Sequence, residues 1–119
     1  MAYKKIVITT EDASGLRSPV CRKFGKSPAY VIATVDSGRI LKVVSDVNRR
    51  FNGHQLGLLQ TASRSGATVL LAGAMEPRVQ AMFNDSGVEV VCDLHGPAEE
   101  VLARYLSPTN FPVDGRISP

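Results

Sequence analysis

The chain has 119 residues, of which 44% are apolar, and a formal net charge of +3 at neutral pH. This length supports one domain with a substantial core and is too short for two domains. So modest a net charge says little about whether the protein binds nucleic acid. With only two cysteines, no signal peptide and no apolar stretch near the length of a membrane span, we expect a cytoplasmic protein without disulfides or a membrane partner.

The first part of the chain is predicted to form three strands. The β-branched run Lys5–Thr9 suits a buried strand and leads into a long polar loop that ends at Pro28. Two further strands follow at Ala29–Val35 and Arg39–Val44, separated by the hairpin sequence Asp36–Gly38. The first strand should therefore run antiparallel to the second and parallel to the third.

The second part is predicted to alternate helices and strands, because the apolar period changes and because capping residues, prolines and glycines punctuate it. The predicted elements are a helix from Asn52 to Gly66, a strand Thr68–Ala72, a helix from Pro77 to Gly87, a strand Val88–Cys92 and a helix that starts at Pro97. Residues 1–107 form the predicted domain. The proline-rich and polar residues 108–119 are expected to be an irregular tail.

The order β-β-β-α-β-α-β-α predicts an α/β domain with a mixed five-stranded sheet flanked by helices. Right-handed crossovers make the last three strands parallel to one another, and the hairpin adds the first strand to that set. The carboxyl ends of four strands then meet at one edge of the sheet, which is where open α/β sheets usually bind ligands.

The loops at this edge carry cations, amide groups and sulfur. No acid occurs between Asp12 and Asp36, whereas four basic residues do. Such a run attracts anions, although basic runs are also common in solvated loops. We assign to the site Cys21, Arg22, Lys23, Phe24, Gly25, Lys26, Asn52, Gly53, His54, Gln55, Gly73, Ala74, Met75, Arg78 and His95.

Two of these residues are candidate metal ligands. The neighbouring cations Arg22 and Lys23 favour a thiolate at Cys21, and the start of a helix leaves His54 neutral with a nitrogen available. The alternatives stay open: a lone loop cysteine is otherwise a small residue, and His54 is otherwise a polar residue near a helix cap. Cys92 ends an apolar strand and is expected in the core.

Four segments of the chain have a familiar order and spacing. They are Phe24–Tyr30, Asn52–Gln55, Ala72–Arg78 and Gly87–Val90. Together they resemble the dinitrogenase iron-molybdenum cofactor biosynthesis family over nearly the whole chain apart from the tail. The resemblance implies a ribonuclease-H-like fold and a role in carrying or processing metal-sulfur clusters, as nitrogenase accessory proteins do. The chain is most similar to small stand-alone members, a type that holds a molybdenum-copper sulfide cluster.

The chain also departs from the family pattern. Lys23 stands where many members have a histidine, and Ala74 and Met75 stand where glycine is common. These changes favour a self-contained anionic cluster held by charge, N–H donors and an apolar wall. The cofactor that the resemblance implies is a molybdenum-copper sulfide cluster, with an iron-molybdenum or iron-sulfur cluster as alternatives. The expected protein partners are P-loop ATPases and cluster-receiving proteins, and we expect a monomer.

The common catalytic motifs are absent from the sequence. There is no phosphate-binding Gly-Lys-Ser/Thr loop, Cys-x-x-Cys, His-Glu-x-x-His or Gly-x-Ser-x-Gly, and the strands carry too few carboxylates for a two-metal nuclease. We therefore expect a protein that is not an enzyme. The alternative functions are a phosphate, nucleotide or RNA binder, with few aromatics for stacking on RNA, and a regulatory partner of a P-loop ATPase.

Overall fold

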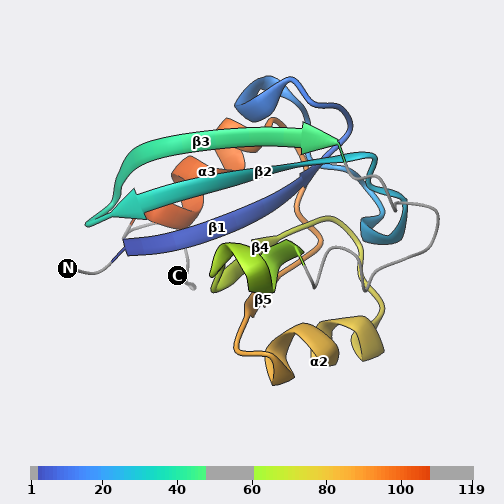
Figure 1. Ribbon diagram of the computed structural model, residues 1–119. Coiled ribbons are helices and arrows are strands. Elements are labelled where there is room, and N and C mark those ends of the chain that lie inside the picture. Colours follow the sequence, from blue (N-terminus) through green and yellow to red (C-terminus); the bar gives the residue numbers. More distant parts are fainter. Residues whose placement is uncertain (1–2, 48–60, 108–119) are drawn as a thin grey trace.

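The structure is a computed structural model that describes residues 3–47 and 61–107 (Figure 1). Its regular elements are the strands β1 (Tyr3–Thr10), β2 (Ala29–Asp36), β3 (Arg39–Val47), β4 (Val69–Leu71) and β5 (Glu89–Val91), the helices α2 (Pro77–Asp85) and α3 (Ala98–Leu106), and the 3-10 helices η1 (Gly15–Arg17) and η2 (Phe24–Lys26). Residues 61–65 are helical and end at a turn, as predicted for the last part of the helix before Gly66. No helix within the described ranges is long and apolar enough to cross a membrane.

The sheet has the strand order β3-β2-β1-β4-β5. The β1–β2 and β2–β3 pairs are antiparallel, and the β1–β4 and β4–β5 pairs are parallel. The predicted mixed five-stranded α/β sheet is therefore confirmed, and the carboxyl ends of β1, β3, β4 and β5 lie at one edge. The narrower ribonuclease-H-like label stays a prediction.

The hairpin between β2 and β3 has the predicted turn. Ser37 and Gly38 both have positive φ, 52° and 80°, as a two-residue hairpin loop of the type I′ class requires. The predicted strand Arg39–Val44 was too short, because β3 continues to Val47. Its last residues pair with the start of β2. The polar residues Ser45 and Asp46 fall within β3, because an edge strand with solvent beside it accommodates such residues.

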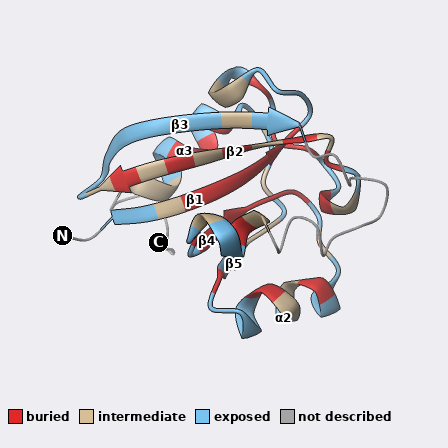
Figure 2. Ribbon diagram, in the orientation of Figure 1, coloured by how far each residue is buried: buried red, intermediate tan, exposed pale blue. Residues whose placement is uncertain are grey.

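Both faces of the central strand β1 are covered. Ile6 and Ile8 pack with α3 on one face, and Val7 packs with α2 on the other. Figure 1 shows the two helices on opposite sides of the sheet, and Figure 2 shows the buried middle of the molecule along β1. Because β1 is enclosed on both faces, the loop that follows it starts from a fixed point.

The loop from Thr10 to Pro28 is more ordered than the sequence suggested. It contains η1 and η2 and buries Val20, Cys21 and Phe24. The ring of Phe24 packs edge-on against Phe83 of α2, with 5.5 Å between ring centroids and an interplanar angle of 88°. The prediction of a merely polar loop was wrong because these few buried side chains attach the loop to the core.

Gly73, two residues after the end of β4, lies directly against the backbone of this loop. A Cβ atom on Gly73 would lie 2.5 Å from the carbonyl oxygen of Arg22 and closer still to that of Cys21. Both obstacles are backbone atoms, so no rotation of a side chain relieves them. The chain after β1 can cross the end of β4 only because residue 73 has no side chain.

We predict that Gly73→Ala lowers the free energy of unfolding by about 3 kcal/mol, since backbone must move to admit one methyl group. Urea unfolding followed by circular dichroism measures this. Gly38→Ala is the control: its φ of 80° also disfavours alanine, but nothing lies within 4 Å of the added atom. It should cost only about 1 kcal/mol. Equal losses in the two variants would contradict the proposed contact.

Candidate functional site

Three loops at the carboxyl edge are joined by backbone hydrogen bonds. The N–H of Ala74 donates to Arg22 O at 2.8 Å, and the N–H of Phe24 donates to Ala74 O at 3.0 Å. On the other side, the N–H of Asp93 donates to Gly73 O at 3.0 Å. We call residues 20–26, 72–75 and 93–96 the loop platform. The predicted meeting of these loops is confirmed, whereas Asn52, Gly53, His54 and Gln55 lie outside the described residues.

The loop platform presents cations to solvent. The side chains of Arg22, Lys23 and Lys26 are exposed, on a stretch without acids. Arg78, just beyond the platform, is also exposed and lies 3.9 Å from the carboxylate of Glu76, an exposed ion pair that contributes little. Asp93 is the acidic residue of the platform itself. Cations therefore outnumber carboxylates here, and the local field attracts an anion.

Several predicted site residues support the platform instead of facing a ligand. Phe24 is only 2% exposed and belongs to the core beside α2, so it anchors the loop and does not form an exposed apolar wall. The N–H groups of Phe24 and Ala74 are engaged in the loop-to-loop hydrogen bonds. Met75 is partly buried against the same cluster, and its carbonyl accepts a hydrogen bond from Gln80 Nε2 at 3.1 Å. Of the apolar residues predicted here, Ala74 is exposed and Met75 is partly exposed.

The two cysteines have the opposite environments to those expected. Cys21 is 5% exposed, and its thiol donates to the Lys23 carbonyl at 3.4 Å. Cys92 was predicted to be a core residue, which is wrong: it is partly exposed. The reason is that β5 ends at Val91 and the chain then turns through Asp93, whose φ is +62°. Partial burial, together with the charge of Asp93 and a 3.7 Å contact from the thiol to its Oδ2, raises the pKa of Cys92.

Within residues 3–47 and 61–107, no three His, Cys, Asp or Glu side chains gather closely enough to hold a metal ion. His95 is exposed in the loop before α3. The neighbouring Gly96 carbonyl accepts the N–H of Val20 at 2.8 Å, so this loop joins the platform on the side that precedes Cys21. The described residues thus offer charge and shape to an anion, and a single buried thiol.

Sequence reasoning missed two features of the site. Asp93 places a carboxylate beside Cys92, whereas only His95 of this loop was predicted to be a site residue. Thr9 is fully buried at the end of β1, and its Oγ1 has no hydrogen-bond partner among the described residues. Its backbone carbonyl accepts the N–H of Cys21 at 3.0 Å. No sequence signal distinguishes this hydroxyl, because threonine is an ordinary member of a β-branched strand.

Solved structures of similar fold are known. The apo form of the orange protein from Desulfovibrio gigas is 25% identical, with a TM-score of 0.76 and coverage of 87% of each chain. A putative NifB protein from Thermotoga is 20% identical, with a TM-score of 0.66 and coverage of 86% of each chain. A putative dinitrogenase from Methanocaldococcus jannaschii is 11% identical, with a TM-score of 0.65, and the alignment covers 89% of this chain and 90% of that protein's chain. No curated protein sequence matches the chain significantly.

The sequence also matches a family model, described as dinitrogenase iron-molybdenum cofactor, over residues 4–108. That match includes every described strand except the first residue of β1, and both described helices. It also includes the whole loop platform and the segments on which the resemblance was based. The chain therefore belongs to the dinitrogenase iron-molybdenum cofactor family.

Proposed function

We propose that this protein binds and carries a preformed anionic metal-sulfur cluster on the loop platform, without catalysing a reaction. Family membership supports a role connected with such a cofactor. The observation that carries the proposal is the set of three exposed cations, Arg22, Lys23 and Lys26, on a loop that backbone hydrogen bonds fix to the loop after β4. A molybdenum-copper sulfide cluster is the favoured cargo, and iron-molybdenum or iron-sulfur clusters are the alternatives.

Charge is the main attraction in this proposal. The sulfides of such a cluster are negative and accept hydrogen bonds from guanidinium and ammonium groups. Because hydrogen bonds fix the backbone that carries these cations before the cargo arrives, binding has to order the side chains but not the loop. The thiol of Cys21 already donates within its own loop, and ligation through it would break that contact. Ligation by Cys21 and by His54 is therefore a secondary hypothesis, and His54 lies outside the described residues.

The exposed position of the platform suits a carrier. A cargo held over Lys23 and Lys26 keeps one side open to solvent, where a second protein can reach it. We infer that a cluster-receiving protein takes the cluster from this side, and that a P-loop ATPase is the second protein partner. Interactions between exposed charges are individually weak and are screened by salt. A cluster held by such charges can therefore be released when a competing surface approaches.

The test measures how tightly tetrathiomolybdate binds to the apo protein in the absence of air, with and without copper(I). Lys23→Ala with Lys26→Ala should raise the dissociation constant about tenfold, since two exposed cations contribute roughly 0.5 to 1 kcal/mol each. Raising the salt concentration should weaken binding to the original protein more than to the variant. Titration calorimetry and absorption spectra give both results.

The matched control is Arg39→Ala with Arg64→Ala, which removes the same charge from exposed positions outside the platform. This control should bind as the original protein does. Equal loss in both double variants would mean that only net charge matters and would contradict a platform site. Binding of phosphate or ATP in preference to the thiometallate would favour the nucleotide-binding alternative.

The thiols give a second prediction. Cys92 should react slowly with iodoacetamide at neutral pH, because its raised pKa leaves little thiolate. Asp93→Asn removes a carboxylate that contributes to this rise, so the pKa should fall and alkylation should become several times faster. Cys21 is buried and should stay unmodified in both proteins. Mass spectrometry over a time course measures how fast each thiol is modified. Faster modification of Cys21 than of Cys92 would contradict the described burial.

A further inference from the structure

The outer edge of β3 is an unpaired strand edge among the described residues. β3 is an edge strand of the sheet and its longest strand, and within the described residues only β2 pairs with it. Figure 2 shows it exposed along most of its length. Its large apolar side chains are 39–52% exposed; they are Ile40, Leu41, Val43, Val44 and Val47. Long apolar edges of this kind readily pair with a further strand.

The sequence of this edge is complementary to itself. Residues 41–47 read Leu-Lys-Val-Val-Ser-Asp-Val. When a second copy runs antiparallel with the two Val44 residues on the two-fold axis, Lys42 lies opposite Asp46 of the second copy. Leu41 then lies opposite the second copy's Val47. The symmetry repeats each pair, so every apolar residue of this stretch meets an apolar residue or Ser45, and every charge meets its opposite.

Charges on an edge strand normally discourage pairing. Lys42 and Asp46 would oppose many incoming strands. In this register, however, Lys42 of each copy lies opposite Asp46 of the other, so two pairs of opposite charge form. The Asp46 carboxylate accepts the N–H of Val47 at 2.8 Å, which holds it along the strand. Charge complementarity therefore selects a second copy of this chain over a strand of arbitrary sequence.

The backbone at the centre of this stretch is regular. The β2–β3 register shifts between Thr34 and Val35, and after that bulge the pairing runs without interruption from Lys42 to Val47. A bulge twists an edge and hinders pairing where it occurs. Here it lies at Leu41, outside the five central pairs, so the regular part of β3 coincides with the complementary part.

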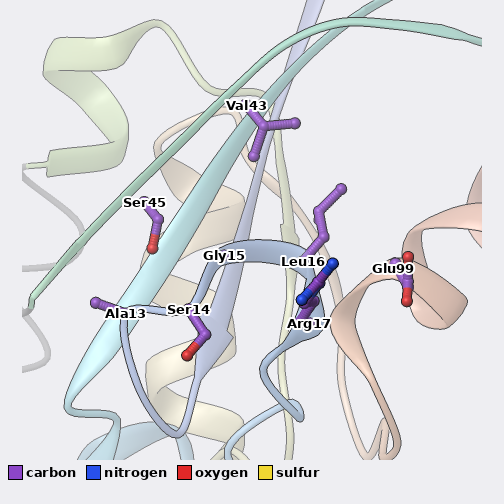
Figure 3. A pocket seen from close by; sticks show the side chains of 8 residues that line it. All are labelled: Ala13, Ser14, Gly15, Leu16, Arg17, Val43, Ser45 and Glu99. Carbon is purple, nitrogen blue, oxygen red and sulfur yellow. The ribbon is translucent and has the colours of Figure 1, made fainter.

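A hollow of about 480 Å³ adjoins the same edge. It is lined by Val43 and Ser45 of β3, by the residues around η1 and by Glu99 of α3 (Figure 3). The Ser45 Oγ is buried and has no hydrogen-bond partner among the described residues. In the symmetric register Ser45 lies opposite Val43 of the second copy. The second strand would therefore continue the wall of the hollow past the edge of β3.

We propose that two copies of this chain pair antiparallel through β3, centred on Val44, to form one continuous sheet. This inference replaces the sequence-based expectation of a monomer. It does not depend on cluster binding, because β3 presents its edge without any cargo.

Sedimentation equilibrium of the apo protein from about 1 µM to about 1 mM tests the proposal, since weak to moderate association falls in this range. The original chain should dimerise. Val44→Lys places two like charges on the axis, and Lys42→Asp turns both ion pairs into repulsions; each should raise the dissociation constant tenfold or more, roughly. Lys42→Asp combined with Asp46→Lys should restore dimerisation to nearly its original strength.

The control is Arg64→Asp, which makes the same two-unit charge change as Lys42→Asp at an exposed position outside β3 and should not affect dimerisation. Circular dichroism confirms that each variant is folded. A chain that stays monomeric up to about 1 mM overturns the proposal and leaves the edge to a strand of another protein. A dimer that is weakened by Lys42→Asp but not restored by the double exchange overturns the proposed register.

Discussion

The arrangement of the site depends on one backbone contact. The carbonyl groups of Cys21 and Arg22 lie against the α-carbon of Gly73, at a distance that no other residue type allows. Because the loop after β1 can cross there, the Ala74 N–H reaches Arg22 O and the Phe24 N–H reaches Ala74 O. Asp93 then joins from the far side through Gly73 O. Three loops that are distant in sequence thereby become one surface, and the backbone that carries Arg22, Lys23 and Lys26 gains a fixed position.

That surface is built for attraction more than for coordination. Its buried side chains include Phe24 and Cys21, which hold the backbone in place, and among its exposed side chains the cations outnumber the carboxylates. The sulfur atoms of the platform belong to Cys21, which is buried, and to Met75, which is partly packed. Cys92 lies just outside the platform, next to the carboxylate of Asp93. A protein that must release its cargo benefits from this balance, since charge and hydrogen bonds exchange more easily than metal-thiolate bonds.

Much of the fold could be predicted from the sequence, because it depends on local signals. The β-branched runs, the Ser37–Gly38 turn and the proline at the start of α2 each specify their own element, and the right-handed crossover rule then orders the sheet. The site was predicted less well. The roles of Phe24, Cys21 and Cys92 depend on contacts between distant segments, such as the Phe24 packing against Phe83. A basic loop looks the same in sequence whether its aromatic residue faces a ligand or the core.

The most direct measurement of the central claim is nuclear magnetic resonance of the labelled apo protein during addition of tetrathiomolybdate. A platform site predicts that amide signals of Arg22, Lys23, Lys26 and Met75 shift together, with one shared affinity. The turns at the opposite edge, Ser37–Gly38 and Ser86–Gly87, should remain unchanged. Shifts spread over all exposed basic residues, or concentrated at Ser37–Gly38, would contradict the proposal that the loop platform holds the cluster.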